Sequence, residues 1–362
     1  MNKQILFFGI LFFGVWISLG AQSRVDLQKH IENTIYYDAK VRFQETPGFI
    51  IGVLIGDSTY VYSYGSQSKT DEVPITDSTL FELGGASKVF SASLLELLVQ
   101  EGEMHYDSTL ATYLGNEKIN TPSLFDVVTH HGGLPRMPQD FGAFELDINN
   151  PYAHYTKSDL KQFYQKYSFL KQTSTYEYSH LSYALLELAM EQQIGFSFEK
   201  ALQQYILSPY SMTDTRLGFG KSQQQLAQGY SMIGEEVAPW STPACHAAIG
   251  VQSSMRDLLQ WIRIQIQTDT FDGLHQKDKP TLVDKNSYAA KGWHVIAPKR
   301  YFDIIAHSGS TAGHRIFMAF IKESQTGVVI LSNSKVGTNG LGYMILKSIN
   351  NDFKKTTRQR KF

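Results

Sequence analysis

The sequence lacks several features that would narrow its function at once. It has one cysteine, Cys245, among 362 residues, so no intrachain disulfide can form and stability must come from core packing. The charges of basic and acidic side chains nearly cancel, since 33 Lys and Arg stand against 34 Asp and Glu. This balance gives no reason to expect a nucleic-acid partner. The local exception is the stretch 351–362, which we interpret as a solvated basic C-terminal tail; a weak contact with an anionic surface is the alternative.

Cofactor and metal signatures are also missing. The glycine pair and lysine of GGASK (84–88) do not have the spacing of a phosphate-binding loop. The sequence has 11 histidines, but those at 130–131, 246, 294 and 314 show none of the Cys, Asp or Glu spacing typical of zinc. We therefore expect neither a metal nor an organic cofactor.

A long apolar run occurs at the N-terminus. Lys3 precedes the almost wholly apolar stretch 5–19, and the small residues of LGA (19–21) offer a cleavage site before Gln22. The pattern predicts a signal peptide over 1–21; an uncleaved anchor is the alternative, although the run is short for a membrane span. No cysteine stands at the cleavage site to carry a lipid. We expect a periplasmic or secreted protein with no stable membrane insertion after cleavage.

The periodic segments predict one α+β unit over residues 22–350. Strand-like runs lie at about 47–66, as a hairpin, and again at about 290–334, while about 103–270 is helical and rich in loops. The two strand sets should join in one antiparallel sheet flanked by helices, with the middle of the chain as a helical lobe. A cleft between sheet and lobe is the expected ligand site. Helices are predicted at 24–45, 87–101, 181–193, 341–349 and after a serine cap at 254.

The segment before the second of these helices is FELGGASK (81–88). Residues three apart share a helix face, so Lys88 should lie on the side of Gly85. A lysine amine in that position can accept the proton of a hydroxyl nucleophile, and a helix N-terminus favours developing negative charge. Glycine at position 85 offers no hydroxyl.

Three further segments contain polar residues that could contribute to the same site. YEYSH (176–180) precedes the helix predicted at 181–193, and HSG (307–309) lies in a predicted strand and continues as STAGH (310–314). THHGGLP (129–135) stands in the helical middle of the chain. With FELGGASK, these segments resemble the serine β-lactamase and DD-peptidase family, in particular its class C β-lactamase-related hydrolases and esterases. The resemblance extends over about 47–334.

The resemblance implies a specific set of site residues. In the family's Phe-x-Ile-Gly-Ser-x-Thr-Lys, the serine is the nucleophile and the lysine takes its proton; Lys88 matches the lysine and Gly85 stands at the serine. Tyr178 matches the family's tyrosine acid/base and is the expected partner of Lys88, while His180 replaces the usual asparagine. The strand backbone that follows the triplet 307–309 would donate one oxyanion-hole hydrogen bond. The implied catalytic residues are Lys88, Tyr178 and His307, and the implied substrate-binding residues are Gly85, His180, Ser308 and Gly309.

Glycine at position 85 leaves three interpretations. The protein binds a small-molecule or peptide ligand through its carbonyl without acylation, the ligand being a peptide, an ester or a cell-wall-like compound. Alternatively, Lys88 and Tyr178 perform acid/base chemistry without a covalent intermediate. In the third, Gly85 is an engineered or erroneous residue in an active esterase, peptidase or β-lactamase-like hydrolase. The missing hydroxymethyl would leave a space for water. Ser87, about 200° from position 85 around a helix, is a poor substitute nucleophile, as are Ser179 and Ser308.

Overall fold

The computed structural model describes residues 27–35, 46–115, 120–143, 150–169, 175–218, 225–281, 285–299, 301–337 and 339–350. The signal peptide predicted over 1–21 and the basic tail at 351–362 lie outside the described residues. Of the helix predicted over 24–45, residues 27–35 are described, and they are helical.

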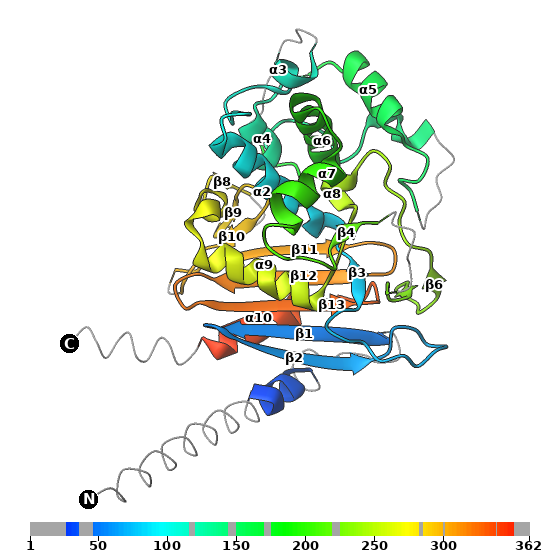
Figure 1. Cartoon of the computed structure of the whole chain (residues 1–362), viewed down its shortest axis with the longest axis vertical. Coiled ribbons are helices and arrows are strands. Elements are labelled where there is room, and N and C mark those ends of the chain that lie inside the picture. The colour runs from blue at the N-terminus through cyan, green and yellow to red at the C-terminus, as the bar shows by residue number, and fades with distance from the viewer. Residues whose placement is uncertain are drawn as a thin grey trace, which may run out of the picture.

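An antiparallel sheet of eight strands forms the base of the molecule (Figure 1), in the order β2-β1-β13-β12-β11-β10-β9-β8. The pairing of β1 with β13, with Ile51 opposite Ile330, brings together strands from the two ends of the described chain. The predicted α+β class is therefore confirmed. The strands are β1 (Gly48–Ile55), β2 (Ser58–Gly65), β8 (Lys279–Pro280), β9 (Ser287–Ala289), β10 (His294–Ile296), β11 (Ile304–Ser310), β12 (Arg315–Ile321) and β13 (Thr326–Ser332).

The central strands are buried on both faces because helices cover the sheet on each side. Ile50 and Leu54 of β1 enter the core that includes α2 and α9, whereas Ile51 and Val53 enter a second core with α10 and residues 27–35. Side chains of a strand point alternately to the two faces of the sheet, which explains this division between the two cores. The approach of α9 to the sheet is close: a Cβ at Gly52 would lie 2.3 Å from the Met255 sulfur.

The helices of the lobe stand above the sheet (Figure 1). α2 is buried along most of its length, and α6 likewise, which explains why both are apolar on nearly all sides. α9 begins after Ser254, whose hydroxyl accepts the Asp257 N–H as the serine cap predicted. The helices are α2 (Ser87–Gln100), α3 (Leu110–Leu114), α4 (Leu124–Val128), α5 (Lys157–Lys166), α6 (His180–Ile194), α7 (Phe198–Leu202), α8 (His246–Ile249), α9 (Met255–Gln267) and α10 (Asn339–Ile349), with the shorter turns η2 (Gly84–Ala86), η3 (Gln139–Ala143), η4 (Gln203–Leu207) and η5 (Asp269–His275).

The middle of the chain also contains short strands that sequence patterns did not predict. β3 (Leu80–Glu82), β7 (Val251–Ser254) and β4 (Arg216–Leu217) form a small sheet, and β5 (Gly229–Tyr230) pairs with β6 (Glu236–Val237). Strands of two to four residues are too short to show a periodic pattern. Within the strand-like run predicted from about residue 290, the first strand, β10, begins at His294, after Gly292 with its φ of +78°.

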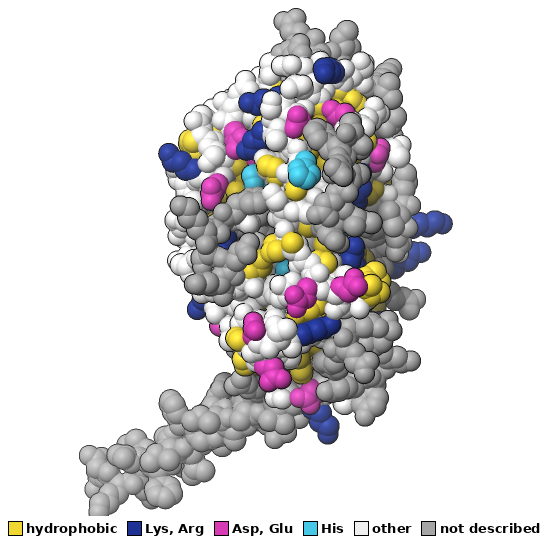
Figure 2. All heavy atoms as spheres, turned by 90° about the vertical axis from the view of Figure 1, so that its right-hand side faces the viewer, with side chains coloured by type: hydrophobic (Ala, Val, Ile, Leu, Met, Phe, Trp, Pro, Cys, Tyr) yellow, Lys and Arg dark blue, Asp and Glu magenta, His cyan; other side chains and the backbone are white. Residues whose placement is uncertain are grey.

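Acidic and basic side chains are interspersed over the face shown in Figure 2, with no large patch of one sign. Within the described residues, no helix combines the length and apolar character needed to cross a membrane.

Candidate functional site

The site forms where β11 meets the turn η2 that precedes α2. A Cβ at Gly309 would lie 1.9 Å from the Leu83 carbonyl oxygen and 2.8 Å from the Ala86 nitrogen, so only glycine allows β11 to approach the turn this closely. Gly84 has a φ of +50°, and a Cβ there would lie 2.6 Å from the Ser310 carbonyl oxygen. Two glycines, one on each side, thus permit backbone-to-backbone contact at the floor of the site.

Backbone N–H and C=O groups of β11 point alternately to its two edges, one paired with β12 and the other facing η2. Thr311 N–H donates to His314 O across the β11–β12 turn, 3.0 Å away. Backbone groups alternate in direction along a strand, so those of Ser308 and Ser310 are directed to the opposite edge. β10 pairs with β11 from Ile304 to Ala306, and beyond that point this edge contacts η2. Accordingly, Ser308 O lies 3.5 Å from the position that a Cβ of Gly85 would take.

The space beside Gly85 is occupied by a tyrosine hydroxyl. A Cβ at position 85 would lie 2.7 Å from the Tyr178 oxygen, closer than such atoms normally approach. The expectation of an open space for water is therefore wrong for this structure. Burial raises the pKa of Tyr178, with a smaller contribution from Tyr176, and Arg136 opposes the shift. At neutral pH this hydroxyl is protonated and is available as a hydrogen-bond donor.

Lys88 is fully buried beneath this hydroxyl, but it does not bond to it. Its Nζ lies 3.0 Å from His180 Nδ1 and donates to Ala248 O at 3.0 Å, while the ring of Tyr178 presents its face, with the centroid 4.7 Å from Nζ. The expected hydrogen-bonded pair of Lys88 and Tyr178 is thus replaced by a pair of Lys88 and His180. Burial, and after it the charge of Arg136, holds the pKa of Lys88 well below its ordinary value.

Histidines surround Tyr178. Its ring centroid lies 4.5 Å from that of His130, 5.6 Å from His180, and 6.4 Å from both His294 and His307. Burial first, and then neighbouring positive charge, lowers the pKa of each of these imidazoles, so all are neutral at pH 7.

The tautomer of His130 follows from its backbone contact. Ser179 N–H donates to His130 Nδ1 at 3.2 Å, which places the proton of the neutral ring on Nε2. His307 Nδ1 lies 2.9 Å from Ser308 O and therefore donates to it. Among the residues that the structure describes, no three His, Cys, Asp or Glu side chains are arranged to hold a metal ion.

The nearby serines have structural contacts. Ser87 Oγ accepts the Val251 N–H at 3.0 Å. Ser179 Oγ donates to Pro135 O at 2.7 Å and accepts the Ser182 N–H, which caps α6. The Ser87 and Ser179 side chains are buried and hydrogen-bonded to backbone groups, whereas Ser308 is half-buried on the edge of β11.

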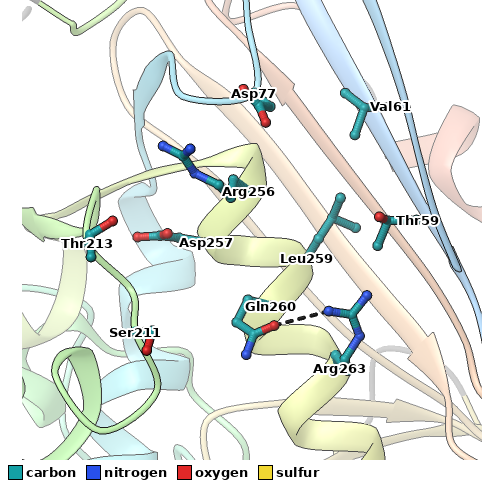
Figure 3. A pocket seen from close by; sticks show the side chains of 10 residues that line it. All are labelled: Thr59, Val61, Asp77, Ser211, Thr213, Arg256, Asp257, Leu259, Gln260 and Arg263. Carbon is teal, nitrogen blue, oxygen red and sulfur yellow. Dashed lines mark hydrogen bonds between the residues drawn. The ribbon is translucent and has the colours of Figure 1, made fainter. Parts of the chain in front are cut away.

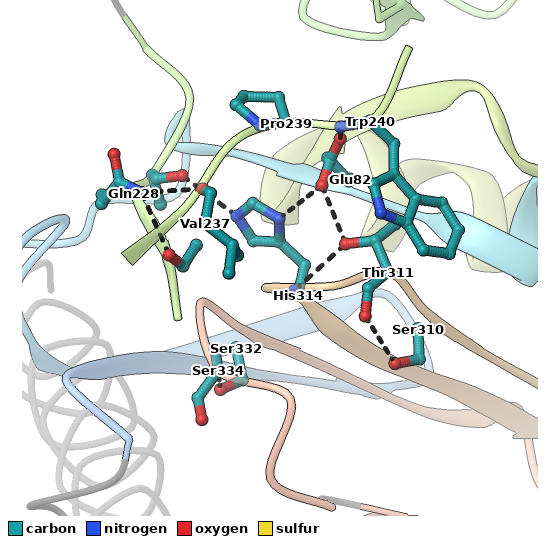
Figure 4. Close-up of polar contacts among 12 residues, drawn as sticks. Glu82, Gln228, Val237, Pro239, Trp240, Ser310, Thr311, His314, Ser332 and Ser334 are labelled. Carbon is teal, nitrogen blue, oxygen red and sulfur yellow. Dashed lines mark hydrogen bonds and ion pairs between the residues drawn. The ribbon is translucent and has the colours of Figure 1, made fainter. Parts of the chain in front are cut away.

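A buried polar network that sequence reasoning missed supports one side of the site (Figure 4). Glu82 accepts the Trp240 N–H at 2.6 Å, the Thr311 hydroxyl at 2.8 Å and His314 Nδ1 at 3.0 Å. His314 Nε2 lies 3.0 Å from Ala227 O. One carboxylate thus connects β3, the chain before α8 and the β11–β12 turn. Its partners lie up to 232 residues from Glu82 along the chain, so no local motif could have revealed the network.

Comparison with known proteins identifies the family. The sequence profile of the Beta-lactamase family matches residues 37–344, well over half of the chain. This chain belongs to the Beta-lactamase family. It is 24% identical to a β-lactamase of Providencia stuartii, over 91% of this chain and 93% of that protein. A β-lactamase of Escherichia coli K12 is 25% identical, over 80% of this chain and 85% of that one.

Solved structures show that the fold is that of β-lactamases and a penicillin-binding protein homologue. A class C β-lactamase superposes with a TM-score of 0.76 at 21% identity, covering 90% of this chain and 97% of that one. An octameric penicillin-binding protein homologue from Pyrococcus abyssi gives a TM-score of 0.72 at 21% identity, over 85% and 73% of the two chains. The predicted family and fold are both confirmed.

The candidate site is distinct from the cavity shown in Figure 3. That cavity, of about 380 Å³, lies between β2, α9 and the chain at 211–213. Its charged groups are largely occupied, because Asp257 accepts three hydrogen bonds from Asp214 and Thr215, and Arg256 pairs with Asp214. None of the predicted site residues lines it.

Proposed function

We propose that this β-lactamase-family protein binds a carbonyl-containing ligand, such as a peptide, an ester or a cell-wall-like compound, without forming an acyl-enzyme. The observation that carries the proposal is Gly85, at the position of the family's nucleophilic serine, with the Tyr178 hydroxyl in the space of the missing side chain. Removing the attacking oxygen leaves carbonyl recognition in place, because the oxyanion-binding donors of this family are backbone N–H groups. Those of Gly85 and Ser310 would take that role here, with the Tyr178 hydroxyl as a third donor.

The binding proposal predicts ligand-dependent stability without turnover. Benzylpenicillin, nitrocefin, p-nitrophenyl acetate and N-acetyl-D-alanyl-D-alanine are the probes. At least one should raise the melting temperature of the unaltered protein, because a ligand that binds only the folded state stabilises it. Intact mass should stay unchanged and no product should form. A covalent adduct on the unaltered protein, or no stabilisation by any probe, contradicts the proposal.

The pair of Lys88 and His180 supports a second candidate, acid/base catalysis without a covalent intermediate. Two buried nitrogens 3.0 Å apart, both with a lowered pKa, can supply an uncharged base at neutral pH. Under this candidate the same probes would be turned over without an adduct. Lys88→Met would abolish turnover, and Tyr178→Phe would reduce it. Turnover that survives both changes excludes it.

An ordinary serine hydrolase with an engineered or erroneous residue 85 is the remaining alternative. The described site is packed for glycine, since a Cβ at position 85 would require the Tyr178 hydroxyl to move. Sequencing the natural gene decides this point directly: a serine codon at position 85 would replace both proposals.

We also propose export to the periplasm or secretion, on the basis of the signal-peptide pattern at 1–21. The mature chain is expected to begin at Gln22. N-terminal sequencing of the protein recovered from periplasmic or secreted fractions checks this, and retention of residues 1–21 in a membrane fraction would favour the uncleaved anchor.

A further inference from the structure

We propose that Arg136 makes the candidate site selective for ligands that carry a carboxylate on the side of the helical lobe. The inference rests on the proposed function, because it describes the ligand of the same site. Arg136 follows the loop after α4, and its carbonyl accepts the N–H groups of His180 and Leu181 at 2.9 and 3.2 Å. These two bonds fix its backbone at the first turn of α6.

The side chain of Arg136 is exposed and lies over the site. Its guanidinium carbon is 5.5 Å from the centroid of the Tyr178 ring, the same ring whose hydroxyl fills the space beside Gly85. A guanidinium that rests on an aromatic ring keeps the N–H groups at its edge available to a ligand. A ligand held by the Gly85 and Ser310 N–H groups would therefore have this cation beside it.

No carboxylate within the described part of the chain forms an ion pair with Arg136. Two acidic residues of the adjoining segments act on other groups. Asp140 accepts a hydrogen bond from Tyr155, and the exposed Glu177 acts on the pKa of Tyr167 rather than on the site.

Charge at the site comes mainly from Arg136, because a guanidinium keeps its charge at neutral pH. Burial is the largest cause that lowers the pKa of His180, His130 and Lys88, so these groups contribute little positive charge at pH 7. Burial also raises the pKa of the nearby Cys245 thiol to about 12. A thiol with that pKa is uncharged at pH 7. Arg136 therefore gives this side of the site a positive charge that no ion pair within the described residues offsets, and that charge favours an anionic ligand.

The shape of the surroundings indicates which anion fits. Aromatic rings extend from the site on the Arg136 side: Tyr152 lies 6.1 Å from His180 and 4.9 Å from Trp240 between ring centroids, and Phe141 lies 5.5 Å from Tyr152. An apolar group packs on such rings, while a carboxylate matches the planar fork of arginine with two parallel hydrogen bonds. The chemistry points to a carboxylate attached to an aromatic or other apolar group.

A matched acid and amide test the inference. Phenylacetate and phenylacetamide have the same ring and nearly the same shape, and they differ in charge. Isothermal titration calorimetry should show that the unaltered protein binds phenylacetate, with an affinity that falls as salt rises, and binds phenylacetamide about tenfold more weakly. Arg136→Gln should remove this preference and Arg136→Lys should retain part of it. Lys161→Gln, which removes one exposed positive charge from α5, should leave both affinities unchanged.

The outcomes separate this inference from the proposed function. Equal binding of acid and amide, no phenylacetate binding in the millimolar range, or unchanged phenylacetate affinity in Arg136→Gln would each overturn the role of Arg136. If one of these results accompanies thermal stabilisation by an ester, amide or penicillin, the carbonyl-binding function stands and the role of Arg136 fails. If phenylacetate binds through Arg136 but no carbonyl probe binds, the anion site stands and the proposed function fails.

Discussion

Gly85→Ser should be labelled covalently by a fluorophosphonate and by benzylpenicillin, whereas the unaltered protein should gain no mass. The substitution places a hydroxyl at the start of α2, on the side of Lys88, and leaves the backbone N–H groups around it unchanged. Loss of the nucleophile in a serine-hydrolase site lowers the reaction rate about 10³-fold or more, so restoring it should raise the labelling rate by at least that factor. Intact mass spectrometry after timed incubation measures the labelling rate.

Gly85→Ala is the matched control for this experiment. It adds the same Cβ, and therefore the same contact 2.7 Å from the Tyr178 oxygen, but no attacking oxygen. It should fold and remain unlabelled. Because Lys88 Nζ is bonded to His180 Nδ1, the double variant Gly85→Ser/His180→Asn should be labelled faster than Gly85→Ser. Labelling of the unaltered chain would show that a different residue attacks, and peptide mapping of the adduct would identify it.

Gly309→Ala should destabilise the fold strongly and abolish ligand binding. The new methyl group would lie 1.9 Å from the Leu83 carbonyl oxygen, which belongs to the backbone and cannot rotate away as a flexible side chain would. β11 and η2 must then separate, which moves the Gly85 and Ser310 N–H groups apart. We expect a loss of about 2–4 kcal/mol in the free energy of unfolding, measured by urea denaturation.

The control for this prediction is Gly340→Ala, in α10. A Cβ at Gly340 meets nothing within 4 Å, so alanine there should be neutral or should stabilise the helix by up to about 1 kcal/mol. Equal unfolding free energies for the two variants would show that the contact between β11 and η2 relaxes readily, contrary to the geometry described above.

The long elements were predictable because their signals are local. The hairpin of β1 and β2 follows from apolar and β-branched runs on either side of a short turn at residues 56–57. α2, α6 and α9 follow from helical periodicity, and the serine at 254 marks the start of α9. The order and spacing of four short motifs was sufficient to indicate the family, which the comparisons confirm. The small sheet of β3, β7 and β4 was missed because its strands have at most four residues.

The contacts inside the site could not be predicted, because spacing along the chain does not determine which atoms meet. Position 85 was recognised as glycine from the sequence, but only the tertiary structure places the Tyr178 hydroxyl where the serine side chain would be. Lys88 was expected to bond to that hydroxyl, yet its partners come from 92 and 160 residues away, in His180 and Ala248.

The sequence by itself determined which functional groups this β-lactamase-family protein has at the candidate site. These are a glycine in place of the nucleophile, a lysine three residues on, and a tyrosine and a histidine at the start of α6. The tertiary structure decided which of these groups contact one another. Packing of β11 against η2, burial of Lys88 and the four imidazoles around Tyr178 set the hydrogen bonds and the direction of each pKa shift. These properties depend on distance and on exclusion of water, and both arise only when segments far apart in the chain come together.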